Sequence, residues 1–142
     1  MPSDEVMGKL LESKRRSAEV CDAFARLRAD GELCESKVAR LVKEFVLAKF
    51  RLNADEVSEA GGNLEKLAQT SIAKMLAIAP EIVKREDKPA NCDGADSATV
   101  KQALMIMALR REFEVDFDCF EAGLCKTTGE LSGLVARSIG AA

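Results

Sequence analysis

Residues 94–139 read GADSATVKQALMIMALRREFEVDFDCFEAGLCKTTGELSGLVARSI and decide the fold of this 142-residue chain. Seven apolar residues in a row, 103–109, follow a Gly-Ala-Asp-Ser turn and indicate a helix that is apolar on every side. Because such a helix is buried on most sides, the sequence predicts that it lies at the centre of a bundle. Asp118 and Thr127 are each followed three residues later by a glutamate, a pattern that predicts the starts of two further helices.

The N-terminal part of the chain also reads as helical. Apolar periodicity predicts a helix over residues 4–29, which ends at Asp30-Gly31 because glycine suits the left-handed position after a helix. A second helix is predicted over residues 35–51 from its continuous apolar stripe.

A third helix and two connectors occupy the middle of the sequence. Asn63 can cap this helix, and Pro80 interrupts it, with a short helical turn expected over residues 80–85. Residues 53–63 and 87–96 are expected to be connectors because they are rich in Gly, Asn and Asp. No segment alternates as a strand would, so we predict an all-α, single-domain bundle of five to seven helices spanning the whole chain.

The composition excludes several classes of function. The chain is 47% hydrophobic and 32% charged, with a net charge of −3 and a pI near 5.2, so it lacks the basic surface of a nucleic-acid-binding protein. It contains no histidine, which excludes Ser-His and Cys-His catalysis and histidine-containing metal sites. No apolar run is long enough to span a membrane. We therefore expect a protein that is not an enzyme, although acidic residues brought together by folding remain an alternative.

The cysteines point to a reducing compartment. Their number is odd, and none of them forms a C-x-x-C pair: Cys21, Cys34, Cys92, Cys119 and Cys125. We expect them to be reduced thiols in a cytoplasmic protein. A zinc site built from cysteines alone is the alternative.

The second half of the sequence resembles acyl carrier proteins. The resemblance is carried by GADS at residues 94–97, Met107-Ala108-Leu109, Glu112-Phe113, and Thr127-Thr128-Gly129-Glu130-Leu131. Residues 36–70 look like the first helix and long loop of that family. The resemblance implies a carrier-like region over residues 36–142 with an insertion at about 72–93, and an N-terminal helical extension over residues 1–35.

The resemblance implies a 4′-phosphopantetheine arm on Ser97, which follows Asp96. The position has a physical basis, because the free N–H groups and dipole of a helix N-terminus favour a phosphodiester. Thr99 is an alternative if the register is taken strictly from the C-terminal side. Ser71 is an alternative if the alignment continues from the N-terminal side, but it lies on the apolar face of a helix and is expected to bond its own preceding turn.

An acyl carrier of this kind would hold its acyl group as a thioester for lipid or polyketide metabolism. Its partners would be a phosphopantetheinyl transferase and acyl-transfer or condensing enzymes. The acyl chain would insert between helices and be lined by Leu104, Ile106, Met107, Leu131, Leu134 and Val135. Lys101, Arg110 and Arg111 make the helix after the serine basic, whereas the helix of the family is acidic. The oligomeric state stays open.

A second interpretation is a non-catalytic interaction module that resembles the TerB-like helical domains. That family has repeated Asp-Gly turns, which Asp30-Gly31 and Asp93-Gly94 match. The two turns belong to a weak internal similarity, which reflects either a duplicated helix pair or chance. Asp30, Asp93 and Asp96 are then weak candidates for a metal site. Neither turn has the carboxylates that calcium requires in an EF-hand.

Overall fold

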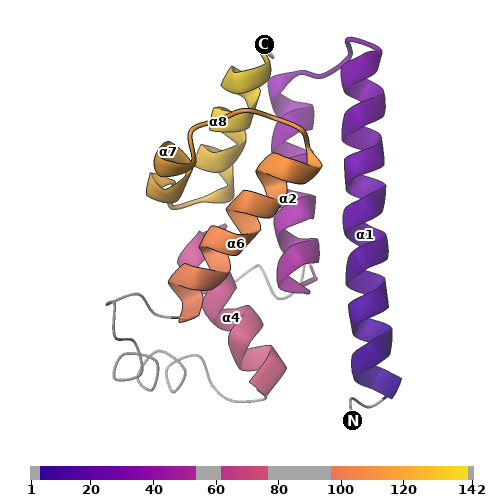
Figure 1. Ribbon diagram of the computed structural model, residues 1–142, viewed down its shortest axis with the longest axis vertical. Helices are drawn as coiled ribbons and strands as arrows, with labels where there is room; N and C mark the ends of the chain where they lie inside the picture. The colour runs from indigo at the N-terminus through magenta and orange to yellow at the C-terminus, as the bar shows by residue number, and fades with distance from the viewer. Residues whose placement is uncertain (1–3, 54–61, 77–96, 141–142) are drawn as a thin grey trace.

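The fold is a bundle of helices, described in a computed structural model over residues 4–53, 62–76 and 97–140. Its helices are α1 (Asp4–Ala29), α2 (Glu35–Phe50), α4 (Leu64–Leu76), α6 (Ser97–Glu112), α7 (Cys119–Leu124) and α8 (Thr128–Ile139) (Figure 1). These six helices, with no strand among the described residues, confirm the predicted all-α bundle.

Helix α2 occupies the centre of the bundle. It packs most extensively against α1 on one side and α8 on the other, and it also contacts α4 and α6 (Figure 1). The helix buries apolar residues on more than one face, which lets it serve several neighbours at once: Val38, Leu41, Val42, Phe45, Val46, Leu47, Ala48 and Phe50. The sequence places this stripe correctly but does not reveal that α2 is the central helix.

The prediction that the helix after the Gly-Ala-Asp-Ser turn is central is wrong. That helix, α6, packs on α4, α7 and α2, yet Leu104 is 61% exposed and Met107 is 56% exposed. The physical reason is that a continuous apolar run covers the whole circumference of a helix but says nothing about how many neighbours surround it. Helix α6 has neighbours on one side and presents its surplus apolar side chains on the other.

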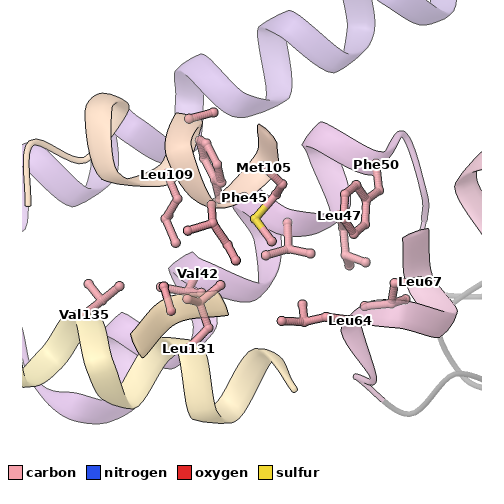
Figure 2. Close-up of a cluster of buried hydrophobic side chains, with 14 of the residues drawn as sticks. Val42, Phe45, Leu47, Phe50, Leu64, Leu67, Met105, Leu109, Leu131 and Val135 are labelled. Atoms are coloured by element: carbon pink, nitrogen blue, oxygen red, sulfur yellow. The ribbon is translucent and has the colours of Figure 1, made fainter. Parts of the chain in front are cut away.

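The core is formed where α2, α6, α8 and α4 face one another. Figure 2 shows side chains of all four helices converging there: Val42 and Phe45 of α2, Met105 and Leu109 of α6, Leu131 and Val135 of α8, and Leu64 and Leu67 of α4. Helix α1 joins this core through Phe24. The Phe24 ring stacks on Phe113 with a centroid distance of 4.2 Å, and Phe113 meets the edge of Phe45 at 5.1 Å.

Local capping signals determine where the helices begin and end. Helix α1 ends as predicted, with Gly31 at a φ of 70° and the Glu32 N–H donating to the Leu27 carbonyl over 2.9 Å. Asn63 caps α4 by accepting from the Lys66 N–H over 2.9 Å. The predicted helix starts at Asp118 and Thr127 are confirmed. Thr127 and Glu130 form a reciprocal capping box at α8, whereas at α7 the Asp118 carboxylate caps the helix by accepting from the Phe120 N–H.

A short backbone contact, which the sequence does not predict, ties the start of α4 to the start of α8. Asn63 and Thr127 form an isolated antiparallel bridge, in which the Leu64 N–H donates to the Lys126 carbonyl over 2.8 Å. The Thr128 N–H donates to the Gly62 carbonyl over 3.0 Å. Gly62 has a φ of +84°, and a Cβ there would lie 3.3 Å from the Thr128 hydroxyl oxygen. Glycine is therefore suited to this position both conformationally and sterically.

Three expectations fall outside the described residues. They are the interruption at Pro80, the short turn over residues 80–85 and the connector over residues 87–96. Helix α4 is described to Leu76. Helix α2 ends at Phe50, one residue before the predicted end, because Arg51 adopts the left-handed conformation with a φ of 58°.

Candidate functional site

Ser97 is the first residue of α6 and is exposed to solvent. The next residue, Ala98, is buried, and Thr99 is exposed. The helix therefore begins with a hydroxyl on the surface and turns its second side chain into the bundle. Asp96, the predicted companion of Ser97, lies outside the described residues.

The surroundings of Ser97 are electropositive. Lys101 follows one turn later on α6, and helical side chains lean toward the N-terminus, so its stem covers the first turn of the helix. Its Nζ lies 5.9 Å from the centroid of the Phe50 ring, at the end of α2. Burial, followed by the positive charge of Arg51, lowers the pKa of Lys101. Two cations and a helix N-terminus together favour an anion at this end of α6.

Ser71 is in a different environment from Ser97. It is 5% exposed, and its hydroxyl donates to the carbonyl of Phe50 over 2.6 Å. The expected bond to its own preceding turn is therefore wrong, because the end of α2 offers an unsatisfied carbonyl at closer reach. Ser71 is a buried structural hydroxyl in this fold, and an enzyme has no access to it without unfolding α4.

Several other polar groups converge on the same end of α2. Arg16 of α1 donates to the Leu52 carbonyl over 2.9 Å, Ser13 of α1 donates to Ala48, and Lys74 of α4 donates to Arg51 over 2.9 Å. The last carbonyls of a helix need partners from outside it, and here two other helices supply them. Sequence reasoning missed these residues because their partners lie more than 20 positions away in the chain.

The six residues expected to line an acyl chain divide into two groups. Ile106, Leu131, Leu134 and Val135 are buried in the hydrophobic core. Leu104 and Met107 point outward from α6 and are more than half exposed. The set thus does not surround one internal space. Its outward members form an apolar surface on the same helix as Ser97.

That surface continues on α7. Val100, Leu104 and Met107 of α6, with Phe120 and Leu124 of α7, are between 47% and 75% exposed, and α6 and α7 are in contact. We call these five residues the α6–α7 apolar surface. The part on α6 has a signal in the sequence, the apolar run after Ser97, but this pattern predicts burial rather than exposure. Exposed apolar side chains gathered on two adjoining helices of a globular protein indicate an interaction site.

A cavity of about 420 Å³ lies at the other end of α6. It is lined by α1 and the end of α6, including Cys21, Phe24, Arg28 and Glu112. Glu112 forms an ion pair with Lys49 over 2.9 Å, and burial, followed by the negative charge of Glu112, raises the pKa of the Cys21 thiol to about 11. Since α6 has 16 residues, this cavity is roughly 20 Å from Ser97 and does not belong to the same site.

Of the three aspartates in the weak metal hypothesis, only Asp30 lies among the described residues. Within residues 4–53, 62–76 and 97–140, no group of three or more Cys, Asp or Glu side chains could hold an ion. Asp93 and Asp96 lie outside those ranges, as does Cys92. In the same described part of the chain, no helix combines the length and apolar character needed to cross a membrane.

Comparison with known proteins assigns no family to this chain. No protein-family model matches the sequence. Neither a curated protein nor a solved structure matches it closely enough to count as a relative. The function has to be inferred from the chemistry of the described residues.

Proposed function

We propose that this protein is an acyl-carrier-like protein that bears a 4′-phosphopantetheine arm on Ser97. The arm would hold an acyl group as a thioester, and the protein would serve enzymes rather than act as one. The observation that carries the proposal is the exposure of Ser97 at the first position of α6. Of the three hydroxyls considered, Ser97 and Thr99 are exposed, whereas Ser71 is buried.

The electrostatics at Ser97 support this assignment. A phosphodiester on the Ser97 Oγ is an anion, and the N–H groups and dipole of α6 stabilise negative charge at that end. Lys101 adds a positive charge one turn away. Together these effects stabilise the negative charge that a phosphodiester would bring to this position.

Leu104 and Met107 offer the acyl chain a surface to lie on. Insertion into the core would require Ile106, Leu131 and Val135 to separate, and all three are packed in one cluster. The outward face of α6 needs no such opening. Each methylene that leaves water contributes about 0.8 kcal/mol, and methionine adapts its shape to chains of different length.

The test is the intact mass of the protein after co-expression with a phosphopantetheinyl transferase of broad specificity. A gain equal to one phosphopantetheinyl group is expected. Ser97→Ala should abolish the gain, and Thr99→Ala, a matched change two residues away on the same exposed turn, should leave it unchanged. An unmodified wild-type chain with several transferases, or a gain that survives Ser97→Ala, contradicts the proposal.

A second candidate function is an interaction module of the TerB-like type, without catalysis. The observation that favours it is the α6–α7 apolar surface, which has no partner among the described residues. This function needs no modified serine. An unmodified but folded chain that binds another protein through this surface would support it over the carrier proposal.

A further inference from the structure

The α6–α7 apolar surface concentrates the exposed apolar side chains of the molecule. Among the described residues, six large hydrophobic side chains are exposed: Leu11, Val100, Leu104, Met107, Phe120 and Leu124. Five of the six belong to α6 and α7, which are in contact, and the sixth, Leu11, lies on α1. Scattered apolar residues need no explanation, but a cluster on two adjoining helices does.

The spacing of these residues makes a stripe along each helix. Val100, Leu104 and Met107 are separated by four and three positions, so they lie on one face of α6. Phe120 and Leu124 are four positions apart on α7 and share a face there. The face of α6 opposite this stripe carries Leu109 and Met105, which enter the core (Figure 2). The stripe is thus the side of α6 that the bundle leaves uncovered.

The charges beside the stripe have opposite signs on the two helices. Arg111 continues the α6 stripe one turn after Met107, and 74% of its side chain is exposed. Glu121 lies beside Phe120 on α7 and is exposed, as is Asp118 at the cap of that helix. Arg110 is held within the chain by Asp116 over 2.6 Å, and Arg111 lies 3.5 Å from Glu112, whose carboxylate also pairs with Lys49 over 2.9 Å. Because Glu112 has one negative charge for two cations, one positive charge remains at the Arg111 end of the α6 stripe, whereas α7 carries the exposed acids Asp118 and Glu121.

We propose that two copies of this chain associate through their α6–α7 apolar surfaces about a twofold axis. A surface with one basic and one acidic side is complementary to itself under such an axis, because Arg111 of one copy then meets Glu121 of the other. A partner carrying charge of a single sign would match only one half of it. The net charge of −3 is small, so overall repulsion between copies is weak. The proposal does not depend on modification of Ser97, and it applies to the chain without an acyl group, because an acyl chain on Leu104 and Met107 would compete for the same surface.

Sedimentation equilibrium over a wide range of protein concentration tests this association. The expected result is a reversible dimer with twice the 15.4 kDa mass of the chain. Leu104→Lys should weaken dimerisation at least tenfold. Leu11→Lys is the matched control, because Leu11 is also an exposed helical leucine, at 63% against 61%, but lies outside the surface. Circular dichroism should show both variants folded, since neither side chain is buried.

A charge swap tests the twofold arrangement. Arg111→Glu and Glu121→Arg should each weaken the dimer, and the double variant should restore it, because the pair meets again with exchanged signs. A chain that stays monomeric at every concentration would overturn the proposal and leave the surface to a different protein. A dimer that Leu104→Lys does not weaken, or that the double variant fails to restore, would overturn it as well.

Discussion

Helices α2 and α6 have the same length and nearly opposite surroundings. Each has 16 residues, and each contains nine apolar ones. Eight residues of α2 are buried, against five of α6. The difference lies in the neighbours, since α2 has packed helices on both sides, whereas α6 has them on one. Equal apolar content therefore produced a buried structural helix in one case and a helix with an exposed apolar face in the other.

Truncating one leucine in each helix tests the difference between α2 and α6 most directly. Leu41 of α2 is 2% exposed, and Leu104 of α6 is 61% exposed. Leu41→Ala should lower the free energy of unfolding by about 2–5 kcal/mol, because it removes buried methyl groups and leaves a cavity. Leu104→Ala should change it by less than about 0.5 kcal/mol. Urea denaturation measures both, and similar losses would mean that α6 is as buried as α2.

The two serines sharpen the contrast at the helix ends. Ser71 closes the end of α2, so Ser71→Ala should cost about 1–3 kcal/mol by leaving the Phe50 carbonyl buried and unpaired. Ser97→Ala, at the exposed start of α6, should cost less than about 0.5 kcal/mol. Thermal unfolding of the two variants checks this ranking. A more destabilising change at Ser97 would contradict it.

Two glycine substitutions compare α8, which packs on α2, with α7, which packs on α6. Gly62, which precedes α4, has a left-handed φ of +84°, and its carbonyl accepts from the Thr128 N–H at the start of α8. Gly62→Ala should therefore cost about 1–2 kcal/mol. Gly123, in the short helix α7, has open space around its Cα. Gly123→Ala should be neutral or stabilising by up to about 1 kcal/mol. Both changes are measured by urea denaturation, and equal losses would argue against a tightly fixed α8.

The last comparison is of two thiols: Cys34 at the start of α2, and Cys21 of α1, which lies beside the end of α6. At the start of α2, the Ser36 hydroxyl, followed by the Lys37 backbone N–H, lowers the pKa of the Cys34 thiol. At the end of α6, the pKa of Cys21 is raised to about 11. Because the thiolate is the reactive form, iodoacetamide at pH 8 should modify Cys34 at least about tenfold faster. The difference between the two alkylation rates should narrow as the pH rises toward 11, because Cys21 then also forms its thiolate. Peptide mapping measures the alkylation rate of each cysteine. Equal rates at pH 8 would show that the environments of Cys34 and Cys21 do not differ.

Much of this fold follows from local signals. The caps at Asn63, Asp118 and Thr127 depend on residues within four positions, and the sequence predicts each of them correctly. The central position of α2 and the bond from Ser71 to Phe50 depend on residues far away in the chain, which no local pattern contains. The exposed start of α6 at Ser97 agrees with expectation, because a polar turn before a helix is a local signal. The exposed apolar face of α6 does not agree with expectation, because the hydrophobicity of a helix does not specify how many helices pack around it.

The decisive measurement is a tryptic map of the chain after co-expression with a phosphopantetheinyl transferase. Cleavage separates residues 86–101, which hold Ser97 and Thr99, from residues 67–74, which hold Ser71. The added mass is predicted on the peptide of residues 86–101, with fragmentation assigning it to Ser97. An added mass on residues 67–74, or on neither peptide while the protein stays folded, would contradict the proposal that the exposed hydroxyl at the start of α6 is the attachment point.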